Sequence, residues 1–439
     1  MKMKKKLKTT PASSRRDFIK KSAIIIPTFS IVPRFVLGGT DYTAPSDKIT
    51  IGFIGTGKQS GGLSSRFLDL SEIQMLAASD VDSKKLALFK DKVNSHYSVS
   101  TGKDNYQGCD TYAIYEELLE RNDIDAVIVC MPDHWHAKAS IDAMKAGKDV
   151  YCEKPLAHTV KEGRKMVKAS EKYSKVVQTG SMQRSWEKFR HACELVRNGY
   201  IGEIKTVKVN VGDPAVPCDL ADEPTPDYLN WDRWLGAAPL RAYNPILSPP
   251  YTDTSWPMWR AYREFGGGIF SDWGAHMFDI AQWGLGMDRS GPSEFIPPTD
   301  KNAKRGLVMK YANGIEMTHE DFGKGWAVQF NGTEGTLEVS RSFLTSDPEK
   351  IVKEVVGEDK IKLYKSDNHY QNWIDCIKSR EKPVCDVETG HRSASVCNLG
   401  NIAYQIGRPL KWDPEKEKFE GDGEANKLLT KDYRKPYKV

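Results

Sequence analysis

The sequence lacks the cysteine and histidine spacings that mark common metal and redox sites. Its eight cysteines form no Cys-x-x-Cys pair, which removes the usual zinc and dithiol motifs. His134 and His136 lie two positions apart, so their side chains diverge on a helix and make a poor metal pair. No other group has metal-ligand spacing, and we predict no metal site.

Long apolar runs and broad positive charge are also missing. Beyond residue 40, no stretch approaches the ~20 apolar residues of a membrane-spanning helix. The formal net charge is +5, but residues 1–34 hold ten Lys or Arg against one acid and carry +9, which leaves −4 for the rest. A slightly acidic body has no electrostatic drive toward nucleic acid. We therefore exclude nucleic-acid binding and a membrane-embedded body.

The first forty residues read as an export signal. Ser14-Arg15-Arg16-Asp17-Phe18-Ile19-Lys20 follows a basic stretch and precedes a mostly apolar run over residues 23–37. A twin arginine in this setting resembles the twin-arginine export signal of bacteria, and two prolines and an arginine make the run a poor membrane span. We expect residues 1–40 to be a signal and the protein to be periplasmic or exported. The alternative is a disordered basic tail.

The chain is too long for one ordinary core, and its patterns change near residue 180. Over 41–180, short apolar runs alternate with helical patterns, which predicts a parallel sheet covered on both faces. Here a helix over 82–94 is followed by a polar loop over 95–110. Over 181–412, a long aperiodic aromatic segment precedes alternating strands, which predicts an α+β domain with an open, largely antiparallel sheet. The charged residues 413–439 are expected to form a surface arm.

A glycine-rich turn follows the first predicted strand, in Gly52-Phe-Ile-Gly55-Thr-Gly57-Lys-Gln-Ser60-Gly61-Gly62. Because it opens a helix, its backbone amides suit a dinucleotide pyrophosphate. Ser60 stands where the third glycine of the usual fingerprint is expected, so ordinary turn glycines remain the alternative. The predicted cofactor contacts in this turn are Gly55, Gly57, Lys58, Gln59, Ser60 and Gly61.

Asp80 strengthens this interpretation as a Rossmann dinucleotide-binding domain. It ends the second predicted strand, 23 residues after Gly57, near the ~20 expected for a carboxylate on the adenosine ribose. An acid at this place repels a 2′-phosphate and favours NAD. Lys84 and Lys85 lie close by, so NADP is not excluded.

Three further segments bring a known family into view. They are Cys130-Met-Pro-Asp-His-Trp-His136, Tyr151-Cys-Glu153-Lys154-Pro155 and Gly266-Gly-Gly-Ile-Phe-Ser-Asp272-Trp-Gly-Ala-His276. With the glycine turn, and in this order, the chain resembles the Gfo/Idh/MocA oxidoreductases from residue 48 to about 410. The resemblance implies hydride transfer between a sugar or polyol carbinol and NAD(P), in a homo-oligomer, dimer or tetramer, built through the antiparallel sheet.

The residues at these positions suit that chemistry. Lys154 lies at the carboxyl end of a predicted strand, where open α/β sheets bind ligands. Asp272 and His276 are i, i+4 neighbours on one helix face, and a histidine suits removal of a hydroxyl proton. A surface lysine and a structural helix pair are the alternatives. By resemblance, Lys154 and His276 handle the hydroxyl proton, while Asp272 orients the substrate and Lys154.

The resemblance also implies contacts around the nicotinamide and the substrate. The predicted cofactor contacts there are Pro132, His134, His136, Glu153 and Lys154, with a capping role as the alternative for His136. The predicted substrate contacts are Lys154, Arg184, Trp259, Arg260, Asp272 and His276. The aromatic segment 228–262 suits carbohydrate, although most of its rings are expected to hold a long loop in place.

Two other functions stay open. A redox-neutral, NAD-dependent glycosidase would need an additional base for a ring C–H, for which Tyr262 or His191 is a candidate. A non-catalytic sugar or nucleotide sensor would keep the fold without needing a proton acceptor. The Lys154, Asp272 and His276 set favours an enzyme over a sensor.

Overall fold

The structure is a computed structural model that describes residues 47–439, so the predicted signal over residues 1–40 lies outside the described residues. The first sheet is parallel throughout, with the strand order β3-β2-β1-β4-β5-β6 of a Rossmann domain. Its strands are β1 (Ile49–Ile54), β2 (Ile73–Ser79), β3 (Asp110–Tyr112), β4 (Ala126–Val129), β5 (Asp149–Cys152) and β6 (Val177–Thr179). The predicted dinucleotide-binding fold is confirmed.

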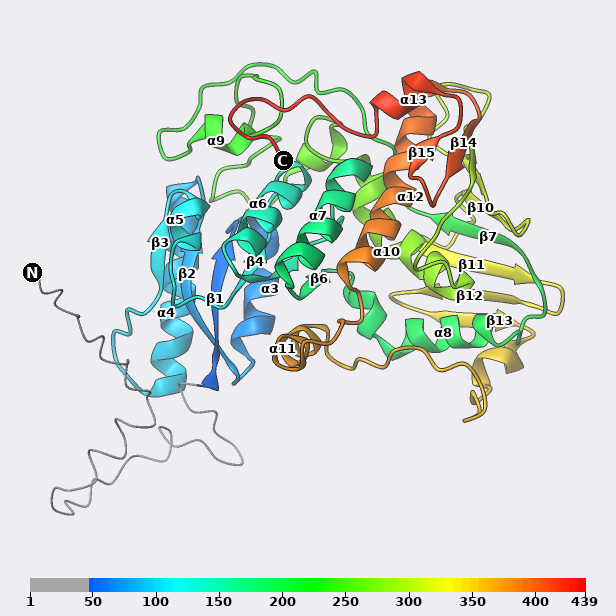
Figure 1. The fold of residues 1–439 in the computed structure, drawn as a ribbon, viewed down its shortest axis with the longest axis horizontal. Helices are drawn as coiled ribbons and strands as arrows, with labels where there is room; N and C mark the ends of the chain where they lie inside the picture. Colours follow the sequence, from blue (N-terminus) through cyan, green and yellow to red (C-terminus); the bar gives the residue numbers. More distant parts are fainter. Residues whose placement is uncertain (1–46) are drawn as a thin grey trace, which may run out of the picture. The chain divides into compact units, whose positions relative to one another are not determined.

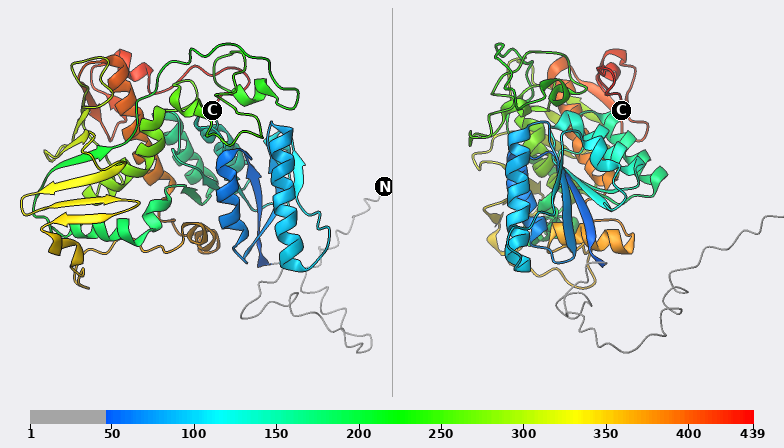
Figure 2. Two further views of the ribbon diagram at one scale, coloured as in Figure 1. Left: turned by 180° about the vertical axis from the view of Figure 1, so that it is seen from behind. Right: turned by 90° about the vertical axis from the view of Figure 1, so that its left-hand side faces the viewer.

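Helices cover both faces of this sheet, as the right-hand view of Figure 2 shows. They are α3 (Lys58–Leu68), α4 (Ser83–Thr101), α5 (Tyr115–Leu119), α6 (Asp133–Lys145) and α7 (Val160–Tyr173). Every residue of β4 and β5 is buried, which is why these strands read as continuous apolar runs.

Helix α4 is longer than predicted. The expected loop over 95–110 begins only after Thr101, because Tyr97 adds a further apolar turn. The Tyr97 side chain is buried, and its hydroxyl accepts the backbone N–H of Met75 at 2.8 Å. Residues 95–101 are mostly polar, and the single buried ring of Tyr97 holds this last helical turn against the sheet.

The second sheet has nine strands in the order β13-β12-β11-β7-β10-β9-β8-β14-β15. All neighbours are antiparallel except β7 and β10, so the predicted open, largely antiparallel sheet is confirmed. The strands are β7 (Ile204–Asn210), β8 (Glu294–Ile296), β9 (Val308–Lys310), β10 (Glu316–His319), β11 (Ala327–Gly332), β12 (Thr336–Ser340), β13 (Leu344–Asp347), β14 (Leu410–Asp413) and β15 (Lys418–Phe419).

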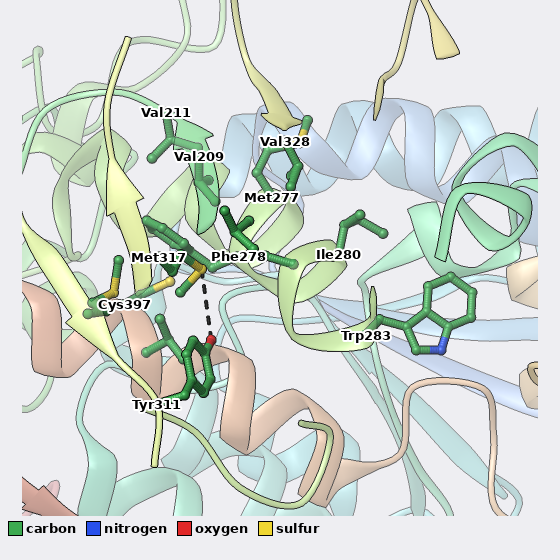
Figure 3. Packing of buried hydrophobic residues seen from close by; sticks show 14 of the residues in the cluster. Val209, Val211, Met277, Phe278, Ile280, Trp283, Tyr311, Met317, Val328 and Cys397 are labelled. Atoms are coloured by element: carbon green, nitrogen blue, oxygen red, sulfur yellow. Dashed lines mark hydrogen bonds between the residues drawn. The ribbon is translucent and has the colours of Figure 1, made fainter. Parts of the chain in front are cut away.

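One face of the second sheet packs against three helices, α8 (Glu187–Arg197), α10 (Gly268–Leu285) and α12 (Val387–Ile406) (Figure 1). Val209 and Val328 are cross-strand partners on this face. Met277 and Ile280 of α10 lie beside them in a fully buried cluster (Figure 3). Alternate strand residues therefore build this core, and it fixes the position of α10, which carries Asp272 and His276.

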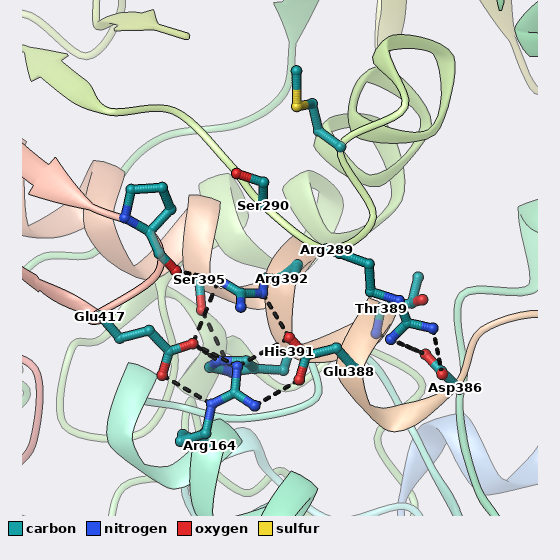
Figure 4. Close-up of polar contacts among 12 residues, drawn as sticks. Arg164, Arg289, Ser290, Asp386, Glu388, Thr389, His391, Arg392, Ser395 and Glu417 are labelled. Atoms are coloured by element: carbon teal, nitrogen blue, oxygen red, sulfur yellow. Dashed lines mark hydrogen bonds and ion pairs between the residues drawn. The ribbon is translucent and has the colours of Figure 1, made fainter. Parts of the chain in front are cut away.

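Later helices return to the Rossmann domain. Helix α11 (His369–Ser379) places Trp373 edge-on against Phe67 and Tyr151, with ring centres 5.6 and 5.7 Å apart. Helix α12 packs along α7, where Arg164 lies between Glu388 and Glu417 (Figure 4) with nitrogen–oxygen distances of 2.6 Å to each. Residues beyond 360 thus complete the first domain's core as well as the second's.

The C-terminal segment lies on the surface and is held there by a few buried side chains. After β15 and the short helix α13 (Gly423–Lys427), it crosses α7, where the N–H of Lys161 donates to the carbonyl of Leu429 at 3.0 Å. Tyr437 is buried against Trp135, with ring centres 5.4 Å apart. A few apolar anchors therefore hold a mostly charged segment on the Rossmann domain.

Candidate functional site

A cavity of about 720 Å³ opens at the carboxyl edge of the parallel sheet, a volume typical of small-molecule sites. The glycine turn and Asp80 line it, and so do Lys154, Asp272 and His276. We call it the central cavity. Residues predicted separately as cofactor and chemical groups therefore share one space.

The glycine turn is shaped for close approach of a ligand. Gly55 has φ +92°, and a Cβ there would lie 2.5 Å from the Cys130 carbonyl oxygen, so only glycine fits. A Cβ on Gly57 or Gly61 would meet nothing within 4 Å. Ser60 replaces the third glycine without strain, because its hydroxyl donates to the Gly57 carbonyl at 2.6 Å.

The start of α3 leaves backbone donors unused. Its N-cap is Gly57, which offers no side chain to accept them. The N–H groups of Lys58 and Gln59 have no acceptor among residues 47–439. Donors of this kind at a helix N-terminus suit the anionic pyrophosphate of a dinucleotide.

Asp80 lies at the end of β2, facing this turn. One carboxylate oxygen accepts the N–H and the hydroxyl of Thr56 at 2.6 and 3.0 Å, and the other accepts the N–H of Asp82 at 2.8 Å. Burial raises the pKa of Asp80 above its ordinary value, although these N–H groups and the charge of Lys85 oppose it. The Lys85 ammonium already pairs with the Asp82 carboxylate at 3.1 Å, so it is not a free cation for a 2′-phosphate. The arrangement favours NAD over NADP.

Lys154 and Asp272 meet as an ion pair, although 118 residues separate them. The Lys154 ammonium donates to Asp272 Oδ1 at 2.6 Å and to the Asp272 carbonyl at 2.9 Å. Arg260, on the 3-10 turn η3 (Met258–Ala261), approaches the same Oδ1 at 3.3 Å. Burial raises the pKa of Asp272, but the charges of Lys154 and Arg260 outweigh it and lower that pKa below its ordinary value. Asp272 is therefore an anion that holds both cations at the cavity.

His276 follows one turn later on α10 and is 4% exposed. Its Nδ1 is buried without a hydrogen-bond partner in the described part of the chain. Burial, reinforced by the charges of Lys154 and Arg341, lowers the pKa of His276 well below its ordinary value. The imidazole is therefore neutral, the form that can accept a proton.

Two acids beside the cavity are held toward their neutral forms. Burial raises the pKa of Glu153 to about 7, against the opposing charge of Lys154 and a hydrogen bond from Gln59. Burial, with the charge of Asp272, raises the pKa of Asp133 to about 8. Asp133 stands in the first turn of α6 and lines the cavity, but sequence reasoning passed over it for the histidines beside it.

His134 and His136, predicted cofactor contacts, are buried beside the cavity and not in its lining. Both are 1% exposed and neither lines the cavity, although Pro132 does. The His136 ring nitrogens meet the carbonyls of Pro155 and Met131 at 2.7 and 2.8 Å, and His134 Nε2 meets that of Trp234 at 3.1 Å. Backbone carbonyls thus meet both ring nitrogens of His136 but only Nε2 of His134, whose Nδ1 has no partner in the described residues, and the cofactor contact stays a prediction for both.

Arg184, a predicted substrate contact, lies in the interior of the protein. Its guanidinium, on η2 (Met182–Ser185), is 2% exposed and donates to Asp279 and Asp288 at 2.8 Å each. All its nitrogens are used and it lies outside the cavity lining, so the structure does not bring Arg184 to the other predicted substrate residues.

The aromatic segment 228–262 contributes to the wall of the cavity. Trp231 and Trp234 of α9 (Trp231–Leu235) stack at 4.5 Å inside a buried cluster, which confirms the loop-holding role expected for most of these rings. Trp259 lines the cavity. The ammonium of Lys58 donates to the Thr254 carbonyl at 2.5 Å, which connects this segment to α3. Tyr262 and His191, the candidate extra bases, do not line the cavity.

Sequence reasoning also missed a group at the far end of the cavity. The rings of Trp326 and Trp273 pack at a tilt with their centres 4.0 Å apart, and the Arg341 guanidinium lies over the Trp273 ring at 4.4 Å. Trp326 and Arg341 stand at strand ends of the second sheet, next to β11 and β12. No short motif surrounds either residue, so only the fold brings them to the site.

The comparisons with known proteins agree with this geometry. The family described as "Oxidoreductase family, NAD-binding Rossmann fold" matches residues 49–181, and the "Oxidoreductase family, C-terminal alpha/beta domain" matches residues 215–439. The chain belongs to the Gfo/Idh/MocA oxidoreductase family. It is therefore an NAD-binding oxidoreductase, as the resemblance implied.

Relatives within the Gfo/Idh/MocA family differ in their named activities. The chain is 26% identical over 238 residues to the myo-inositol 2-dehydrogenase of Thermotoga maritima, covering 54% of this chain and 55% of that protein. It is 31% identical over 161 residues to the alpha-N-acetylgalactosaminidase of Shewanella oneidensis, covering 36% and 33%. The crystal structure of the WlbA dehydrogenase of Chromobacterium violaceum, in complex with NADH and UDP-GlcNAcA, shares the fold at a TM-score of 0.58 and 18% identity, covering 84% of this chain and 96% of that one.

The residues of the cavity fit a dinucleotide. The unused N–H groups of α3 suit its phosphates, the space beside Gly57 and Gly61 admits them, and Asp80 faces the place of the adenosine ribose. No group of three His, Cys, Asp or Glu in residues 47–439 has the geometry to hold a metal ion, and no helix in that range is long and apolar enough to cross a bilayer.

Proposed function

We propose that this protein transfers hydride between a carbinol carbon of a sugar or polyol and NAD. One observation carries the proposal: a neutral, unpaired histidine and a lysine–carboxylate pair border the same cavity as the uncapped glycine turn. The named activities of relatives, such as myo-inositol 2-dehydrogenase, support a polyhydroxylated substrate.

Each residue of the site has a distinct task in this reaction. The nicotinamide, when bound, supplies the hydride acceptor or donor. Lys154, held by Asp272, donates a hydrogen bond to the reacting oxygen and stabilises negative charge on it as the hydroxyl proton leaves. His276, whose imidazole is neutral, receives that proton. In the reverse direction the same two groups return the proton to the oxygen.

The test is a screen of sugars, polyols and aryl glycosides with two simultaneous readouts, reduced-nicotinamide absorbance and aglycone release. A dehydrogenase gives net absorbance in proportion to product. A sensor binds sugar and gives neither signal. Absence of both signals across the panel, from protein that binds NAD, would contradict the proposal.

The redox-neutral glycosidase is the second candidate, favoured by the relative named alpha-N-acetylgalactosaminidase. It requires a further base for a ring C–H, and Tyr262 and His191 lie outside the cavity lining. His191 Nε2 instead meets the Val352 carbonyl at 3.2 Å. Aglycone release without net reduction would replace the dehydrogenase proposal with this one.

We also propose that the protein is exported through a twin-arginine-type signal. Arg15 and Arg16, with the apolar run that follows, support this. Since such signals carry folded proteins and free NAD is scarce outside the cytoplasm, we expect the cofactor to stay bound. Fractionation of the native cells, followed by denaturation of the periplasmic protein, should release a nicotinamide dinucleotide. Retention in the cytoplasm would contradict export.

Assembly into a homo-oligomer, dimer or tetramer, is a further part of the proposal. The second face of the nine-stranded sheet carries half-buried polar side chains that bond across strands, as Gln329 does to Glu338 at 2.7 Å. Such a face supports a polar sheet-to-sheet contact. Light scattering across a range of protein concentrations tests this, and a monomer throughout would contradict it.

A further inference from the structure

Arg341 borders the substrate end of the central cavity, beside the residues assigned to proton transfer. It follows β12 directly and lines the cavity together with Trp273. Trp273 stands on α10 between Asp272 and His276, so the guanidinium over its ring lies one side chain away from the proposed chemistry.

The guanidinium of Arg341 is held in one place. Its Nε donates to Gln183 Oε1 at 2.9 Å, and Gln183 is itself 1% exposed. The rings of Trp273 and Trp186 lie 4.4 and 5.7 Å from the guanidinium carbon. A planar cation fixed by one hydrogen bond and two aromatic rings loses little freedom when it binds a ligand.

Its terminal nitrogens are unused. Three arginines line the cavity, and in the described residues Arg233 pairs with Glu116 and Arg260 with Asp272, while Arg341 has no carboxylate partner. Its Nη1 and Nη2 make no hydrogen bond within residues 47–439. Burial lowers the pKa of Arg341 despite the raising charge of Asp272, as expected of a cation that has lost water without gaining a counter-ion.

The charges nearby do not neutralise it. Lys154 and Arg260 already share the single carboxylate of Asp272. Asp133 and Glu153 are the other acids near these cations, and their raised pKa values of about 8 and about 7 keep them largely or partly protonated at neutral pH. The substrate end of the cavity therefore holds excess positive charge.

We propose that Arg341 binds a carboxylate of the substrate, so that the natural substrate is a sugar acid, such as a uronic acid or its glycoside. The two terminal nitrogens match the two oxygens of a carboxylate. Trp326, 42% exposed and packed against Trp273, offers an apolar face for the sugar ring. This inference rests on the proposed function, because it names the substrate class of the same site.

The experiment compares matched neutral and acidic sugars on the NAD-loaded protein. Methyl glucoside is paired with methyl glucuronide, and methyl galactoside with methyl galacturonide, with kcat/KM taken from reduced-nicotinamide absorbance. Glucose 6-phosphate is added as a different anion. The proteins are wild type, Arg341→Gln, Arg341→Lys and the control Arg289→Gln, which loses the same charge at a half-exposed position outside the cavity.

We expect wild type and Arg289→Gln to prefer the acids. Arg341→Gln should lose about 10- to 100-fold in kcat/KM for the acids, the range of charge-assisted hydrogen bonds, and less than about threefold for the neutral sugars. Arg341→Lys keeps the positive charge but lacks the two parallel N–H donors, so its kcat/KM for the acids should lie between those of wild type and Arg341→Gln. Equal losses for acid and neutral sugars, or a preference for the phosphate, would overturn the carboxylate assignment.

A binding measurement separates this inference from the proposed function. Calorimetry on NAD-loaded His276→Ala protein should show tighter binding of glucuronide than of glucoside, and the difference should vanish when Arg341→Gln is added. This result would stand even if no sugar in the panel is oxidised, in which case the proposed function alone fails. Equal binding of both sugars to the first protein would contradict the carboxylate site.

Discussion

Helix α10 carries two aspartates two turns apart, and their surroundings differ. Asp279 faces the interior, where Arg184 and the Ser393 hydroxyl satisfy both of its oxygens. Asp272 faces the cavity, where two cations share Oδ1 while Oδ2 makes no hydrogen bond to a described residue. Both carboxylate oxygens of Asp279 are therefore hydrogen-bonded, whereas Asp272 keeps one oxygen free to accept a hydrogen bond from a ligand.

The same difference runs through the rest of the site. His276 Nδ1, the Arg341 terminal nitrogens and the first N–H groups of α3 all lack partners among residues 47–439. By contrast, the buried rings of His136 and the guanidinium of Arg184 are fully engaged. These unused groups border the same cavity, so one ligand there could bind several of them.

The largest expected effect on stability lies at the interior pair. Arg184→Met leaves Asp279 buried without its counter-ion, which should cost about 3–5 kcal/mol of unfolding free energy. Arg260→Met, at the cavity, leaves Lys154 on Asp272 and should cost less than half as much. Urea unfolding of both variants measures this. Equal losses would break the distinction between interior and cavity pairs.

Asp80 tests whether a cavity carboxylate serves a ligand. Asp80→Asn should weaken NAD binding by about 10- to 100-fold, since a charged hydrogen-bond acceptor is lost, and weaken NADP binding less. Asp125→Asn is the matched control, because Asp125 Oδ2 accepts the N–H and hydroxyl of Thr50 as Asp80 accepts those of Thr56, but at the edge away from the cavity.

Calorimetry with both dinucleotides gives the comparison. If Asp125→Asn weakens NAD binding as much as Asp80→Asn does, the effect comes from fold stability and not from a ribose contact. If the NAD to NADP ratio is unchanged in Asp80→Asn, a different carboxylate selects the cofactor.

The smallest effect concerns Asp133 and pH. Its pKa is about 8 in the folded protein and near 3.8 when exposed, so the folded state binds more protons between these values. Stability from this group is therefore full below about pH 4 and is lost as the pH rises through 8. Asp133→Asn should flatten the fall in melting temperature of cofactor-free protein between pH 6 and 9 by about 2 °C or more. Parallel curves would place the Asp133 carboxyl in contact with water.

Much of the fold could be predicted from the sequence because its signals are local. Strands β4 and β5 are buried throughout and therefore read as continuous apolar runs, and the glycine turn is recognised by the spacing of its glycines. The convergence of Lys154 and Asp272 was also predictable, since the family motifs place both at the opening of the sheet. These features need only neighbours in the chain or a known pattern.

Other features depend on partners far away in the sequence. Nothing near Arg184 distinguishes it from Arg341, yet Arg184 meets carboxylates 95 and 104 residues later, while the side chain of Arg341 makes its one hydrogen bond in the described residues to Gln183, 158 residues earlier. The contact of Tyr437 with Trp135 likewise could not be predicted from the charged composition of residues 413–439, because the two rings meet only in the folded chain. Pairing, and so function, is set by tertiary contacts.

We propose that Lys154 and His276 handle the hydroxyl proton without holding the dinucleotide. The most direct test is single-turnover reduction of bound NAD by an accepted sugar, in wild type, Lys154→Ala and His276→Ala. Both variants should bind NAD as wild type does and reduce it about 10²–10⁴-fold more slowly, the usual contribution of a general acid or base. Reduction at the wild-type rate in both variants would contradict the account.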